Sequence, residues 1–69
     1  MAVDANRLIH MANQIAKNLA AQGEQEAIAG TLQHIRDFWD PRMKAAILAS
    51  DQTGLEPIAA AAVRQLAEI

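Results

Sequence analysis

A proline follows an aspartate near the middle of a chain that otherwise consists mostly of helix-forming residues. Pro41 has no backbone N–H, and its ring disfavours the helical conformation in the residue before it. Asp40 should therefore leave any helix that precedes it. It can also cap a new helix that begins at Pro41, where the missing N–H costs nothing. We therefore expect helices that meet at this break.

Helical periodicity extends on both sides of the break. A first helix is predicted over Ala5–Gln22, capped by Asp4 and ended by a left-handed Gly23, with the buried stripe Leu8, Met11, Ala12, Ile15 and Leu19. A second is predicted over Glu24–Trp39, with the stripe Ile28, Leu32, Ile35 and Trp39. Within it, Gly30 has two interpretations. Either it lets a neighbouring helix approach closely, or it is tolerated although glycine weakens a helix. The sequence does not decide between these two interpretations.

Two shorter helices are predicted after the break. The first covers Pro41–Ala49, and a polar turn follows over residues 50–54. The last starts at Glu56–Pro57, and one of its faces is expected to carry Leu55, Ile58, Ala62, Leu66 and Ile69. Its alanine-rich other side is expected to be exposed or covered by another protein. The predicted fold is all-α, a single domain over residues 1–69 with three to four short helices.

The chain is short and its core should be thin. It has 69 residues and no cysteine, and 16 of its residues are alanine. Scaffolds of this size usually need disulfides, a metal or a partner, and here disulfides and thiolate-held metal centres are excluded. The net charge of −2 comes without a basic stripe, which argues against nucleic acid as a partner. No apolar run suits a membrane span, so we expect a cytoplasmic protein.

Catalysis by this chain alone is not expected. His10 and His34 lack the spacing of paired metal ligands, and the carboxylates lie mostly near helix starts and turns. The sequence also has no phosphate-binding glycine loop and no Gly-x-Ser-x-Gly motif.

Both aromatic residues stand just before the break, where a contact with another protein is the expected function. Trp39 continues the apolar stripe, so core packing is its first interpretation, whereas Phe38 points about 100° away and can join an outer patch with His34, Arg42 and Met43. For Arg42, spacing does not separate a solvated charge, an ion pair with Asp37 or Asp40, and a contact to a partner carboxylate.

Two sequence segments resemble the delta subunit of NAD-dependent formate dehydrogenase. They are Met11-Ala12-Asn13-Gln14-Ile15 and His34-Ile35-Arg36-x-Phe38-Trp39-x-Pro41-Arg42-Met43. The resemblance extends from about Leu8 to Leu48. It implies a non-catalytic accessory subunit of a bacterial molybdenum- or tungsten-dependent complex that oxidises formate and reduces NAD.

The resemblance further implies which subunits carry the cofactors and which subunit this chain contacts. Molybdopterin, iron–sulfur clusters, FMN and NAD are expected in partner subunits and none in this chain. The large catalytic subunit is the expected partner, and the residues expected to contact it are Asn13, Gln14, His34, Phe38, Trp39, Pro41, Arg42 and Met43. The alternatives are a free-standing helical adaptor or homodimer and, ranked last, a small metal- or ligand-binding protein.

Overall fold

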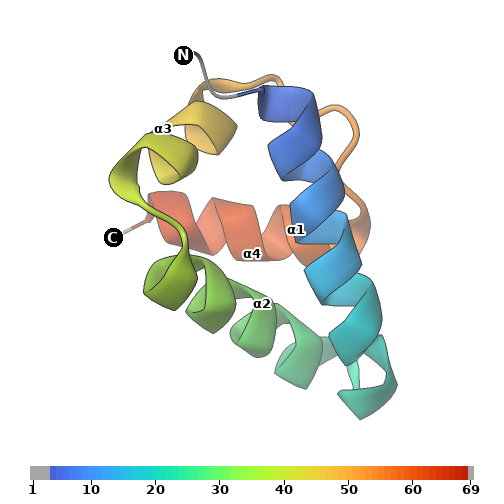
Figure 1. The fold of residues 1–69 in the computed structure, drawn as a ribbon. Helices are drawn as coiled ribbons and strands as arrows, with labels where there is room; N and C mark the ends of the chain where they lie inside the picture. The colour runs from blue at the N-terminus through green and yellow to red at the C-terminus, as the bar shows by residue number, and fades with distance from the viewer. Residues whose placement is uncertain (1–3, 69) are drawn as a thin grey trace.

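The computed structural model describes residues 4–68, and these residues form helices joined by short turns (Figure 1). In chain order the elements are α1 (Ala5–Leu19), the short 3₁₀ helix η1 (Ala20–Gln22), α2 (Glu24–Phe38), α3 (Pro41–Ala49) and α4 (Pro57–Ala67). Within the described range there is no strand, which confirms the all-α prediction.

The first helix begins where its cap predicts and ends earlier than expected. Asp4 Oδ1 accepts a hydrogen bond from the Asn6 backbone N–H at 3.0 Å. The predicted last turn of the helix is the tighter η1 instead. Gly23 then reverses the chain with φ +102° and ψ 153°. The positive φ agrees with the prediction, although ψ is extended rather than helical, a combination that suits a residue without a Cβ.

The break between α2 and α3 is wider than a single residue. Asp40 is extended, as predicted, but Trp39 is extended as well, with φ −86° and ψ 135°. The prediction that α2 includes Trp39 is therefore wrong by one residue. Asp40 Oδ1 accepts from the Met43 N–H at 2.9 Å, which confirms it as the cap of α3, and Lys44 Nζ donates to the Arg36 carbonyl at 3.1 Å near the end of α2.

The loop between α3 and α4 is polar, as the sequence predicts. Ser50 Oγ donates to the Ile47 carbonyl at 2.7 Å, and Gln52 has a positive φ of 59°. The Thr53 backbone N–H donates to Asp51 Oδ1 at 3.0 Å. This bond, together with one from the Thr53 side chain, holds the pKa of the exposed Asp51 carboxyl below its ordinary value.

The core lies where α2 and α4 pack together, with α1 against both (Figure 1). Its largest fully buried side chains are Ile35, Ile47 and Val63, and with them the buried Thr31 hydroxyl donates to the Ala27 carbonyl at 2.7 Å. In α2 the predicted stripe is correct except that Ile28 is only half-buried.

Two predicted helix faces are rotated in the structure. In α1 the buried residues are Leu8, Ile9, Ala12 and Ala16, whereas Met11, Ile15 and Leu19 are half-buried. In α4 the buried residues are Ala59, Ala62, Val63 and Leu66, and Leu55 and Ile58 are half-buried. The alanine-rich side of α4 is therefore partly core, because small side chains let neighbouring helices approach closely. The prediction for Ile69 lies outside the described residues.

Candidate functional site: an exposed aromatic pair beside an apolar groove

Phe38 and Trp39 lie in opposite environments at the end of α2. Trp39 is 4% exposed and belongs to the core cluster, whereas Phe38 is 74% exposed. The chain leaves the helix directly after Phe38, so the indole turns inward and the phenyl ring remains outside. Trp39 thus packs as its place on the stripe predicts. It offers almost no surface for the partner contact that the sequence analysis expects of it, and that contact stays a prediction.

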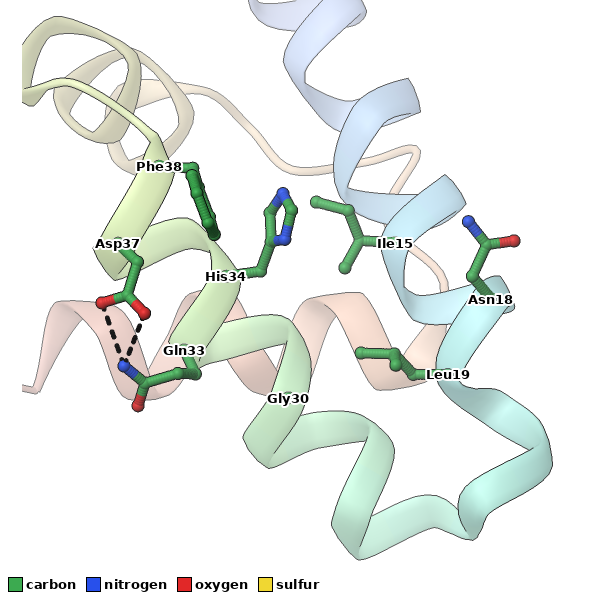
Figure 2. A pocket seen from close by; sticks show the side chains of 8 residues that line it. All are labelled: Ile15, Asn18, Leu19, Gly30, Gln33, His34, Asp37 and Phe38. Atoms are coloured by element: carbon green, nitrogen blue, oxygen red, sulfur yellow. Dashed lines mark hydrogen bonds between the residues drawn. The ribbon is translucent and has the colours of Figure 1, made fainter.

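His34 lies one helical turn before Phe38, and the two rings pack together. Their centroids are 4.8 Å apart and their planes meet at 40°. Residues four apart on a helix share a face, so this pair is a direct consequence of the sequence spacing. Figure 2 shows the imidazole lying between Phe38 and Ile15 of α1. The aromatic pair therefore borders the space between α1 and α2.

That space is an open groove of about 400 Å³, which we call the α1–α2 groove. Its lining comes from both helices and consists of Ile15, Asn18, Leu19, Gly30, Gln33, His34, Asp37 and Phe38 (Figure 2). A Cβ placed on Gly30 would lie 2.8 Å from Leu19 Cδ1. The close-approach reading of Gly30 is therefore the correct one, since α1 packs a side chain directly on it.

Asp37 and Asp40 both have partners other than Arg42. Gln33 Nε2 donates to the two carboxylate oxygens of Asp37 at 3.0 and 2.9 Å, and Asp40 caps α3. Arg42 and Pro41 are exposed in the first turn of α3, and Met43 is half-buried. These three residues begin α3, shortly after Phe38 in the chain, and we call them the corner of α3.

Asn13 has an internal role that the sequence does not reveal. Its Nδ2 donates to the Gly54 carbonyl at 2.9 Å, and its Oδ1 accepts from the Glu56 backbone N–H at 2.9 Å. Both ends of the amide thus hold the start of α4 against α1, and we call this pair of bonds the Asn13 clamp. Gln14 is exposed, with its Nε2 3.4 Å from His10 Nε2.

The predicted contact residues therefore separate into different places. His34 and Phe38 border the α1–α2 groove, Pro41, Arg42 and Met43 form the corner, and Trp39 is in the core. Asn13 and Gln14 lie on another side of α1 from the groove-lining Ile15 and Leu19. The sequence does not identify Ile15, Leu19 and Gly30 as lining residues, although Ile15 and Leu19 belong to an apolar stripe of α1 that is wider than the core needs.

Two properties of the described residues bear on the class of protein. Across residues 4–68, no helix is long and apolar enough to cross a membrane. In the same range, no three His, Cys, Asp or Glu side chains gather in a way that could hold a metal ion.

Fold and site together define a small helical protein whose most distinctive surface is an aromatic pair beside an apolar groove. Residues 7–63 match the family model described as the NADH-dependent formate dehydrogenase delta subunit FdsD. The chain belongs to this family, as its resemblance in sequence indicates. Comparisons with curated proteins and with solved structures give no match.

Proposed function

We propose that this chain is a non-catalytic accessory subunit that docks on the large catalytic subunit of a formate dehydrogenase complex and supports its assembly or stability. Membership of the delta-subunit family supports a place in such a complex. In this proposal the complex is cytoplasmic and depends on molybdenum or tungsten. Its other subunits carry molybdopterin, iron–sulfur clusters, FMN and NAD, and oxidise formate to carbon dioxide.

The observation that carries the proposal is the exposure of Phe38. Among residues 4–68 it is the one large hydrophobic side chain in the exposed class. Removing such a side chain from water stabilises a contact by roughly 1.5–3 kcal/mol, which the isolated chain does not gain. The neighbouring α1–α2 groove can accept a side chain in return. A protruding ring beside a hollow is the arrangement that anchors protein interfaces.

The corner of α3 extends this docking surface. Arg42 is exposed, and its candidate intramolecular partners Asp37 and Asp40 are engaged elsewhere. In the proposed complex its guanidinium binds a carboxylate of the large subunit, a geometry for which arginine is well suited. Pro41 and Met43 add apolar area around it.

Replacing Phe38 with alanine tests the proposal. We expect the variant Phe38→Ala to bind the large subunit at least tenfold more weakly, because truncating a central aromatic anchor costs 2 kcal/mol or more. Binding is measured by biolayer interferometry with the large subunit immobilised. The matched control is Gln25→Ala, an exposed residue of α2 outside the groove, which should bind like the wild type.

The isolated Phe38→Ala variant should unfold at the wild-type temperature, because the ring is mostly in solvent already. Circular dichroism on heating checks this point. Equal affinity of Phe38→Ala and wild type for the large subunit would overturn the proposed docking surface.

A further inference from the structure

A second groove lies on another side of α1, between that helix and the starts of α2 and α4. It has a volume of about 380 Å³, and we call it the α1–α4 groove. Part of its lining is apolar, from Ala16, Ala20 and Ile58. A smaller hollow of about 160 Å³ shares Asn13, Lys17 and Glu56 with it and extends it along α1 toward His10 and Gln14.

The Asn13 clamp fixes one wall of this groove. Its two hydrogen bonds of 2.9 Å hold Gly54 and Glu56 to α1 across 41 and 43 residues of sequence. The backbone of Glu56, and with it the start of α4, is therefore held at a set position against the helix. A groove with fixed walls binds a partner without the entropic cost of ordering a loop.

The linings of the two grooves carry the same net charge of −1, but the α1–α4 groove has two carboxylates and one lysine, whereas the α1–α2 groove has a single carboxylate. Glu24, at the start of α2, and Glu56, the cap residue of α4, both line the α1–α4 groove, and both are exposed. Lys17 is the one cationic residue in its lining, so the lining carries a net charge of −1. In the α1–α2 groove the carboxylate is that of Asp37, which already accepts two hydrogen bonds from Gln33.

We propose that the α1–α4 groove binds a basic segment of another subunit of the same complex. An aliphatic side chain of that segment covers Ala20 and Ile58, and a neighbouring lysine or arginine pairs with Glu24 and Glu56. This inference rests on the proposed function, since it takes the partner to be a subunit of that complex. With two separate surfaces, the chain holds its partners bivalently, which raises the effective concentration of each contact.

Site-specific photo-crosslinking in the assembled complex tests this proposal. Benzoylphenylalanine replaces Ala20, an exposed residue of the α1–α4 groove, and in a control protein it replaces Gln65, an exposed residue of α4 outside the grooves. Mass spectrometry then identifies the crosslinked peptides. We expect Ala20 to capture a segment of another subunit with lysine or arginine close to the crosslink, and Gln65 to capture none.

Charge variants make the test specific. We expect Glu24→Gln with Glu56→Gln to lower the Ala20 crosslink yield about three- to tenfold, because exposed ion pairs contribute 0.2–1 kcal/mol each. Glu26→Gln is the matched control, since Glu26 shares the first turn of α2 without lining the groove. An unchanged yield in the double variant, a captured segment without basic residues, or a crosslink to a second copy of this chain would overturn the inference.

The two proposals fail separately. If Phe38→Ala binds the large subunit normally while the Ala20 crosslink depends on Glu24 and Glu56, the Phe38 docking surface is wrong and the α1–α4 groove stands. If Phe38→Ala weakens binding while the Ala20 crosslink is absent from the wild-type complex, the Phe38 docking surface stands and the proposal for the α1–α4 groove is wrong.

Discussion

At the scale of single residues, a change of backbone conformation after Phe38 separates two aromatic side chains. Trp39 turns into the core, where burying an indole stabilises a small fold, and Phe38 stays on the surface beside His34. The sequence predicts that the two rings point apart, since neighbouring helical residues differ by about 100°. It does not show which neighbouring helix meets each ring. That depends on the path of α3 and α4.

Asn13 illustrates a residue whose role the sequence conceals. Nothing near it in the chain indicates a structural function, because the groups that it binds are 41 and 43 residues away. The resemblance to delta subunits places it among partner contacts, whereas the structure gives its amide an internal use. Gln14, its neighbour, is exposed.

Asn13→Ala should therefore destabilise the isolated chain. The substitution removes two hydrogen bonds that join α1 to the start of α4, and the expected loss is about 1–3 kcal/mol in the free energy of unfolding. Urea denaturation followed by circular dichroism measures it. Gln14→Ala, an exposed neighbour, should change stability by less than about 0.5 kcal/mol. Equal stabilities for the two variants would show that the clamp contributes nothing.

At the scale of elements, the starts of the helices follow from local signals, whereas the buried faces of α1 and α4 do not. Asp4, Asp40, Pro41 and Pro57 mark helix starts through their own hydrogen bonds or ring geometry, and the structure places the starts there. The sequence predicts the buried face of α4 less well, because an alanine-rich helix can bury either of two sides. Packing against α2 decides between them, and burial of Ala59 and Val63 is the result.

The contact between Leu19 and Gly30 joins α1 to α2, and both residues line the α1–α2 groove. We expect Gly30→Ala to add helix propensity worth about 1 kcal/mol, offset by the displacement of Leu19, whose Cδ1 lies 2.8 Å from the new Cβ. In a Leu19→Ala background that displacement is absent. Gly30→Ala should then stabilise more than it does in the wild type.

A double-mutant cycle of thermal unfolding measures this coupling. The expected coupling is at least about 0.5 kcal/mol. Additive effects of Gly30→Ala and Leu19→Ala would mean that the Leu19 side chain and a Cβ at position 30 do not compete for the same space.

At the scale of the whole molecule, a thin core and two surface grooves fit an accessory subunit better than an independent unit. The fold class, the break and the position of the aromatic pair could be predicted from periodicity, proline and spacing. The α1–α2 groove could not, because it depends on the half-buried Ile15 and Leu19 and on how α1 and α2 diverge. The α1–α4 groove depends on contacts between residues more than forty positions apart.

Hydroxyl-radical footprinting of the free chain and of the assembled complex tests the central claim, that Phe38 is exposed until a partner subunit covers it. In the free chain we expect rapid oxidation of Phe38 and slow oxidation of Trp39, which is only 4% exposed. In the complex, oxidation of Phe38 should fall at least severalfold while that of Trp39 stays low. Equal oxidation of Phe38 in the free and assembled states would contradict the account.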